Sequence, residues 1–291
     1  GKTPQIEYLI RLLKDNFKTS VLSRGYKRKT KGFVLLNNSH TAEDVGDEPL
    51  QYFKKFDNIN VVVDANRVAG ISKLIDDKSP EVILLDDAFQ HRKVKGSFYI
   101  LLTKYDDLFT DDFILPTGNL REGRSGTKRT DVIVVTKCPS NLSVENQNKI
   151  RNKLKKFNKE VFFSKISYAE KTSGNTEVLI DDLKNYEVLL ITGIANPIPL
   201  LSFLNEKRVS FKHLKFPDHH NFTKSEIENI QKSFSELTSS KKMILTTEKD
   251  YVRLEKSLDE ASFLGIRTSF LNHQEEFNSL INSHIKQNQR C

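Results

Sequence analysis

The sequence predicts an α/β fold, in which a parallel sheet with helices on both faces is followed by a smaller second α/β domain. Short unbroken runs of Val, Ile and Leu alternate with stretches of helical periodicity, which is typical of strands buried in a parallel sheet. The alternation is interrupted near residue 160 and then restarts. We therefore expect domains at 1–160 and 161–291.

The first domain contains four apolar runs, each of which predicts a strand. Apolar spacing over 5–15 predicts a helix, after which a short strand is expected at about 19–23. The expected order after that is a strand within 58–66, a helix over 67–77, a buried strand over 81–85, and strands within 97–104 and 130–139. Ligands of such sheets bind beyond the carboxyl ends of the strands. The polar residues that follow each run are therefore the candidates for function.

The second domain is expected to begin with a linker of two strands, 161–168 and 176–183, around the polar turn KTSGN. The α/β alternation restarts in YEVLLITGIANPIPLLSFL (186–204). A strand within 208–220, a helix over 223–237 and the segment KKMILTTEKDYVRL (241–254) are expected to follow. The last segment, from Leu271, predicts a helix and a polar end.

Composition narrows the class of protein without selecting a partner. The 291 residues carry a net charge of +8, which suits nucleic acid, anionic lipid, phosphorylated substrates or simply a solvated Lys-rich surface. No apolar run approaches the roughly 20 residues that span a bilayer. Two cysteines, Cys138 and Cys291, make neither a disulfide framework nor a metal cluster, which fits a reducing cytosol.

Gly1-Lys2-Thr3 matches the last three residues of the phosphate-binding motif G-x-x-x-x-G-K-[ST], and a helical pattern follows it, as that motif requires. In such a loop the Lys reaches the β/γ-phosphates, the Thr hydroxyl binds Mg²⁺, and the helix N-terminus faces the anion. The tripeptide is short enough to occur by coincidence. Because the only methionine is Met243, we expect that Gly1 is not a translation start and that the motif is truncated at this point.

Asp86 and Asp87 close the apolar run EVILL, which is the pattern of a strand-end carboxylate that holds the Mg²⁺ shell. The alternative is that one of them is a helix N-cap. Together with Lys2 and Thr3, these carboxylates on a neighbouring α/β unit predict a P-loop NTPase-like sheet that uses ATP and Mg²⁺. Taken alone, GDEP (46–49) and LPTGNLRE (115–122) predict only loops, and Asp218-His219-His220 is either a fragment of a metal site or a surface loop.

As an ordered set, these motifs resemble the tetraacyldisaccharide 4′-kinases, the lipid A 4′-kinases of Gram-negative bacteria. The resemblance covers nearly the whole chain, with Ala88 where many members have Gly and Asn66 where many have Asp. It runs through GKTP (1–4), SRGY (23–26), GDEP (46–49), VVDANR (62–67), LLDDAFQH (84–91), LPTGNLRE (115–122), VTK (135–137), TGIANP (192–197), FPDHHNFT (216–223) and TTEKD (246–250).

The resemblance implies transfer of the ATP γ-phosphoryl group to the 4′-hydroxyl of tetraacyldisaccharide 1-phosphate, which gives lipid IVA. It also implies a phosphate loop preceded by a strand and an apolar helix, and a peripheral location at the anionic, cytoplasmic face of the bacterial inner membrane. The roles it implies are catalysis by Asp47, His219, Lys2, Arg67 and Arg121; ATP binding by Gly1, Lys2, Thr3, Gln90 and His91; substrate binding by Tyr26, Glu48 and Glu122; and Mg²⁺ binding by Thr3, Asp86 and Asp87.

Within this scheme Asp47 is the base toward the sugar hydroxyl, and His219, from the second domain, is expected to pair with it. Two other classes of protein remain as alternatives. A nucleic-acid-associated ATPase should show basic and aromatic residues interleaved on one surface, and no such cluster is evident in the sequence, so we expect no nucleic-acid partner. A non-catalytic binding protein would have no need of a base such as Asp47.

Overall fold

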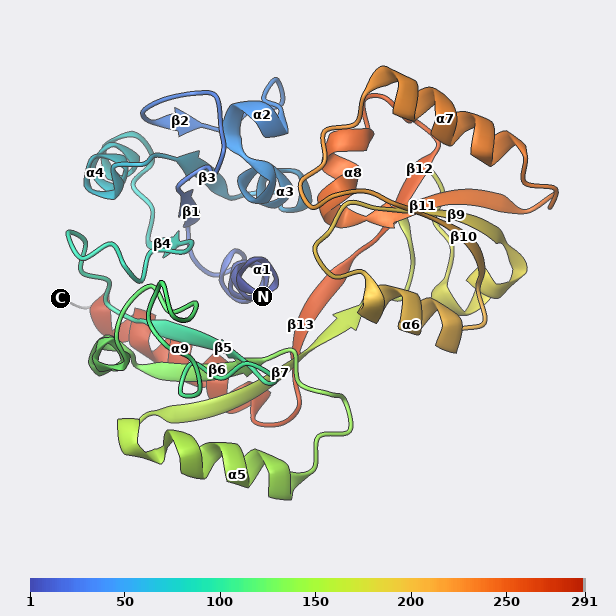
Figure 1. Cartoon of the computed structure of the whole chain (residues 1–291). Coiled ribbons are helices and arrows are strands. Elements are labelled where there is room, and N and C mark those ends of the chain that lie inside the picture. Colours follow the sequence, from blue (N-terminus) through green and yellow to red (C-terminus); the bar gives the residue numbers. More distant parts are fainter. Residues whose placement is uncertain (290–291) are drawn as a thin grey trace.

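The computed structural model describes residues 1–289, so that Cys291 lies outside the described residues. Its strands form three sheets, and helices cover both faces of each (Figure 1). The α/β prediction is confirmed. No described helix is both long enough and apolar enough to cross a membrane.

The first sheet has the strand order β2-β3-β1-β4, in which β1 pairs in parallel with β3 and β4 while β2 is antiparallel. Alternate residues of its central strands face opposite ways: Val21 packs toward α1 and α3, whereas Leu22 packs toward α4. Asn66 caps α4 by accepting a hydrogen bond from the Ala69 amide, so the Asn found here provides the N-cap. The elements are α1 (Lys2–Leu13), β1 (Thr19–Ser23), β2 (Val34–Leu35), α2 (Ala42–Val45), α3 (Asp47–Lys55), β3 (Asn60–Val63), α4 (Arg67–Lys78) and β4 (Val82–Leu85).

The second sheet has the order β13-β7-β6-β5. One face packs on α1 and α9 and the other on α5, so α1 contributes to the cores of both the first and the second sheet. The elements are β5 (Ile100–Lys104), η1 (Arg124–Arg129), β6 (Val132–Thr136), α5 (Val144–Leu154), η2 (Lys155–Phe157), β7 (Glu160–Tyr168), β13 (Ile266–Phe270) and α9 (Gln274–Asn288).

The third sheet, of order β10-β9-β11-β12-β8, forms the second unit. Helix α6 covers one face and α7 the other. The elements are β8 (Ser173–Gly174), η3 (Ile180–Asn185), β9 (Glu187–Thr192), α6 (Ile198–Glu206), β10 (Ser210–Lys215), α7 (Lys224–Ser235), β11 (Lys242–Thr247), α8 (Glu248–Leu254) and β12 (Ala261–Leu264).

The expectation of one continuous sheet in the first domain is wrong for the described residues. Strands β4 and β5 are edge strands of two different sheets, and they line a cavity of about 460 Å³ together with apolar residues of α1 and α9. Strand β4 was expected to be buried, but its residues are only partly buried because it lies at this edge. The Gln5 amide, 3% exposed at the cavity wall, makes no side-chain hydrogen bond to the described residues.

The linker also differs from the prediction. Strand β7 pairs antiparallel with β13, which is nearly 100 residues later, rather than with the segment 176–183, most of which is 3₁₀ helix or loop. In Figure 1, β7 and β13 run side by side from the second sheet toward the second unit. A division between residues 160 and 161 stays a prediction, and within the structure α9 returns to pack against Leu9 and Leu13 of α1.

Candidate active site

The start of α1 brings two cationic side chains onto Asp87, which follows β4. Lys2 Nζ lies 2.7 Å from Asp87 Oδ2, and Arg121 donates to both carboxylate oxygens at 2.6 and 3.2 Å. Burial by itself would raise the pKa of Asp87, but the hydrogen bonds from Arg121 and Lys2 outweigh it and lower the pKa. An ammonium from the first turn of α1 and a guanidinium thus converge on one anionic group, as they would on a phosphate.

Asp86 faces a different environment from its neighbour. Its carboxylate is buried, with the hydroxyls of Ser23 and Tyr52 each 3.4 Å away. Burial is the main reason that the pKa of Asp86 is raised to about 6, and the nearby anionic Asp87 and Glu48 raise it further. The tandem carboxylates therefore differ in the direction of their pKa shifts and in their partners, and neither of them is the N-cap of a described helix.

Arg67 is a buried side chain that contacts the backbone at the Asp86 site. It is 3% exposed, and its guanidinium donates to the backbone carbonyls of Asp64 and Asp86. The direct phosphate contact expected of Arg67 stays a prediction. In the structure its two hydrogen bonds go to backbone carbonyls, one of them at the end of β4.

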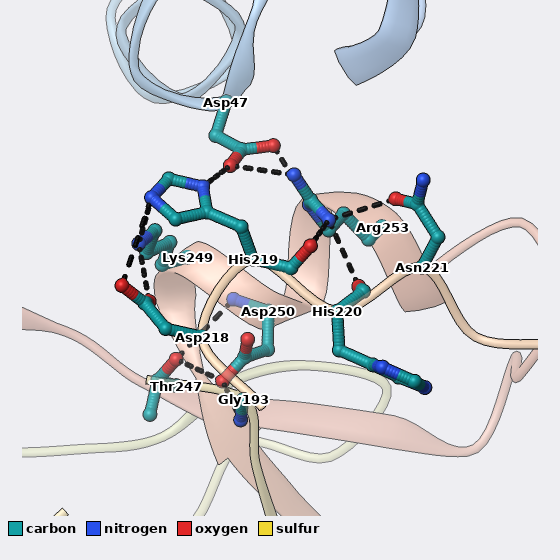
Figure 2. A network of polar contacts seen from close by, with 10 residues as sticks. All are labelled: Asp47, Gly193, Asp218, His219, His220, Asn221, Thr247, Lys249, Asp250 and Arg253. Carbon is teal, nitrogen blue, oxygen red and sulfur yellow. Dashed lines mark hydrogen bonds and ion pairs between the residues drawn. The ribbon is translucent and has the colours of Figure 1, made fainter. Parts of the chain in front are cut away.

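Asp47 is the first residue of α3, after Gly46, whose φ of 94° is readily adopted only by glycine. Its carboxylate is 3% exposed, and Oδ2 lies 2.6 Å from Nδ1 of His219, 172 positions away (Figure 2). The expected contact between these two residues is present. The GDEP segment is therefore the start of a helix, not only an exposed turn.

Arg253 of α8 forms a bidentate ion pair with Asp47. Its Nε and Nη2 donate to the two carboxylate oxygens at 2.7 and 2.8 Å. Its Nη1 donates to the carbonyls of His219 and His220 and to Asn221 Oδ1 (Figure 2). One guanidinium thus joins the base candidate of the first unit to the His219 loop of the second.

The His219 loop is itself fixed by residues from two further motifs. The Gly193 carbonyl accepts from the His219 amide at 3.2 Å, and the Gly193 amide donates to Asp250 at 2.9 Å. Thr247 caps α8 by accepting from the Asp250 amide. TGIANP, FPDHHNFT and TTEKD therefore form one hydrogen-bonded unit beneath the His219 ring.

The remaining predicted residues divide between the cavity and the surface. Gln90 and His91 line the cavity with Lys2 and Arg121, and Gln90 Oε1 and His91 Nε2 have no hydrogen-bond partner among the described residues. Asp47 and His219 do not line it. The exposed Tyr26 ring lies 6.4 Å from the His219 ring, edge to face.

Two predicted residues are occupied by structural contacts. Glu122 accepts from Arg129 at 2.6 Å and from Arg92 at 3.5 Å, and its role in substrate binding stays a prediction. His220 contacts Glu226 at 3.0 Å, which belongs to the capping box of α7. No group of three or more described His, Cys, Asp or Glu residues could hold a metal ion, which excludes the metal-fragment interpretation of Asp218-His219-His220 for this part of the chain.

Comparison with known families assigns the chain. The family profile described as tetraacyldisaccharide-1-P 4′-kinase, LpxK, matches residues 1–286. The chain belongs to the tetraacyldisaccharide 4′-kinase family. Its activity is that of a 4′-kinase in lipid A biosynthesis, as the ordered motifs predict.

Similar members of the 4′-kinase family come from several bacteria. The chain is 50% identical over 293 residues to the tetraacyldisaccharide 4′-kinase of Flavobacterium johnsoniae, covering 99% of this chain and 84% of the relative. It is 41% identical over 312 residues to that of Bacteroides thetaiotaomicron, covering 100% and 82%. Among solved structures, "apo" form LpxK from Aquifex aeolicus in complex with ATP matches with a TM-score of 0.75 and 30% identity, covering 98% of this chain and 84% of that one.

Sequence reasoning about this 4′-kinase missed the roles of Tyr52, Lys249 and Arg253. Tyr52 gives no sequence signal, since it lies within an amphipathic helix like any core aromatic. Lys249 lies within TTEKD, which is part of the family resemblance, and Arg253 follows it one helical turn later. The spacing of four residues on one helix face was the signal that could have found this pair.

Proposed function

We propose that the chain transfers the γ-phosphoryl group of ATP to the 4′-hydroxyl of tetraacyldisaccharide 1-phosphate, forming lipid IVA and ADP. The observation that carries this proposal is the buried Asp47 carboxylate, which is held by His219 and Arg253 from the other unit. Glu48, the next residue, lies close enough to raise the pKa of Asp86. This supports a base candidate in the electrostatic neighbourhood of Asp86.

ATP is proposed to bind at the start of α1, and the solved structure of the Aquifex aeolicus relative, a complex with ATP, supports ATP as the ligand. Lys2 would exchange Asp87 for the β- and γ-phosphates, with Gly1 and Thr3 at the same helix end. Gln90 and His91 supply unpartnered polar atoms to the adjoining cavity.

The donor set near Thr3 fits Mg²⁺, which prefers oxygen ligands and is commonly held by one or two carboxylates together with substrate phosphates. Asp86 and Asp87, with the Thr3 hydroxyl, are the proposed ligands. A buried carboxylate such as Asp86, whose pKa is raised to about 6, favours a cation beside it. When bound, the ion would neutralise charge on the β- and γ-phosphates.

Asp47 is proposed to accept the proton of the 4′-hydroxyl as the new oxygen–phosphorus bond forms and the bond to the β-phosphate oxygen breaks. His219 orients the carboxylate through Nδ1. Arg121, half exposed on Asp87, is placed to reach a transferring phosphoryl group, because its guanidinium fork matches phosphate oxygens. Arg67, whose guanidinium donates to the Asp86 carbonyl, stays a predicted phosphate contact.

The exposed Tyr26 ring beside His219 is the proposed platform for the disaccharide, and Glu48, which follows Asp47, is the second proposed substrate contact. Because the acceptor's acyl chains lie in a bilayer, we propose peripheral contact with the anionic cytoplasmic face of the inner membrane. The net charge of +8 supports such contact.

Incubation with γ-labelled ATP, Mg²⁺ and tetraacyldisaccharide 1-phosphate in mixed micelles tests the proposal. Label should move to the lipid, and omission of the lipid should leave ATP largely intact. DNA or RNA added in place of lipid should not stimulate turnover. Hydrolysis that is stimulated by nucleic acid and indifferent to the lipid would contradict the proposed reaction.

A further inference from the structure

Lys249 contacts the ring nitrogen of His219 that does not face Asp47. Its Nζ lies 3.0 Å from His219 Nε2 and 3.0 Å from Asp218 Oδ1 (Figure 2). Nδ1 of the same ring lies 2.6 Å from Asp47 Oδ2. The order along this chain of contacts is Asp218, Lys249, His219 and Asp47.

The protonation of the ring follows from the donors and acceptors present. A lysine ammonium has three donors and no acceptor, so Nε2 must be the accepting, unprotonated nitrogen. Neutral imidazole then carries its proton on Nδ1 and donates it to Asp47. The positive charge that offsets Asp47 comes from Arg253 rather than from the ring.

Asp218 explains why this arrangement requires Lys249. Asp218 Oδ2 lies 3.9 Å from Nε2, with the ammonium bonded to both groups. Without the lysine, a carboxylate would face each ring nitrogen, Asp47 on one side and Asp218 on the other. Two opposing carboxylates favour the doubly protonated imidazolium.

We propose that Lys249 is a positioning residue that keeps His219 neutral, with its proton on Nδ1, and so preserves Asp47 as a base. An imidazolium beside Asp47 would lower the affinity of the carboxylate for the hydroxyl proton. The charged and titratable groups that face the ring are Asp47 of α3, Lys249 and Arg253 of α8, Asp218 of its own loop, and Tyr26 after β1. The consequence for catalysis rests on the proposed function of Asp47 and His219.

Nitrogen NMR of ¹⁵N-imidazole-labelled protein tests the protonation state directly, and the His219 signals are assigned by their loss in His219→Gln. At neutral pH the unmodified chain should show a protonated Nδ1 and an unprotonated Nε2. Lys249→Met should protonate both nitrogens. Lys249→Arg, which also offers only donors, should keep the original state, and Lys207→Met, at an exposed pair with Asp181, is the matched control. An imidazolium in the unmodified chain, or unchanged signals in Lys249→Met, would overturn the proposal.

Kinetics supply the second readout. Lys249→Met should lower kcat at neutral pH by about tenfold or more, with the KM for ATP unchanged, because it weakens a base whose whole contribution is typically about 10²–10⁴-fold. Activity should recover as pH rises and the imidazolium loses its proton, whereas Lys249→Arg should retain most of the kcat. A kcat deficit that is constant with pH would show a merely structural role. If the unmodified chain transfers no phosphate to the lipid, the proposed function fails while the NMR result still decides the tautomer.

Discussion

The Asp47–Arg253 pair allows a quantitative test of how the two units are joined. Asp47 is 3% exposed and the Arg253 side chain 15%, so Arg253→Met would leave a nearly buried carboxylate without its cation. Breaking a buried ion pair typically costs about 3–5 kcal/mol. Because His219 still contacts Asp47 and Arg253 is not fully buried, we expect about 2–4 kcal/mol. At about 2 °C per kcal/mol for a chain of this size, Tm should fall by roughly 4–8 °C.

A double-mutant cycle isolates the pair from the other contacts of Arg253. Asp47→Ala removes the charge that needs a partner, so adding Arg253→Met should then cost little beyond the lost backbone contacts. The coupling energy from urea unfolding should be about 2 kcal/mol. The stability of Arg253→Lys should lie between that of the unmodified chain and that of Arg253→Met, because lysine keeps the charge but lacks the bidentate fork. The exposed pair Lys212–Glu236 is the control, with coupling below about 1 kcal/mol. Costs for Asp47 and Arg253 that add within about 0.5 kcal/mol would refute the reasoning.

Three further predictions concern chemistry, charge and membrane. Asp47→Ala and His219→Ala should each lower kcat by about 10²–10⁴-fold with little change in the KM for ATP, and the double variant should be little worse than the worse single one; multiplicative losses in steady-state assays would contradict a shared role. Because the pKa of Asp86 is raised from 3.8 to about 6, ionising it destabilises the fold as pH rises through this window, so Asp86→Asn should stabilise the nucleotide-free protein at pH 7 by up to about 3 kcal/mol while abolishing Mg²⁺-dependent turnover. Melting curves at pH 4 and pH 7 check this, and a lower Tm for Asp86→Asn at pH 7 would indicate a structural role. Finally, the protein should sediment with anionic vesicles and be released as salt is raised, since exposed charges are screened; retention at 1 M salt would rule out an electrostatic attachment.

The sequence by itself determined the α/β class, the positions of most strands and helices, and the family. Runs such as 61–63 and 132–135 are apolar throughout because both of their faces are buried, and this pattern is visible without any tertiary information. The ordered motifs identified Asp47, His219, Lys2 and the Asp86-Asp87 pair as candidates, because the residue types and their order can be read directly from the sequence.

Only the tertiary structure decided how these residues are partnered. That β4 and β5 do not pair, and that β7 pairs with β13, depends on hydrogen bonds between segments whose local patterns are equally compatible with other neighbours. The partners of the charged side chains were also decided by the tertiary structure. Arg67 and Glu122 resemble ligand-binding residues in sequence, and only the structure shows which groups of the protein they contact. Lys249 and Arg253 resemble an ordinary solvated helix face until α8 is placed against α3, where their donors meet His219 and Asp47. A side chain's chemistry is set by the groups within hydrogen-bonding distance, and for this site most of those groups lie 30 to 206 positions away along the chain.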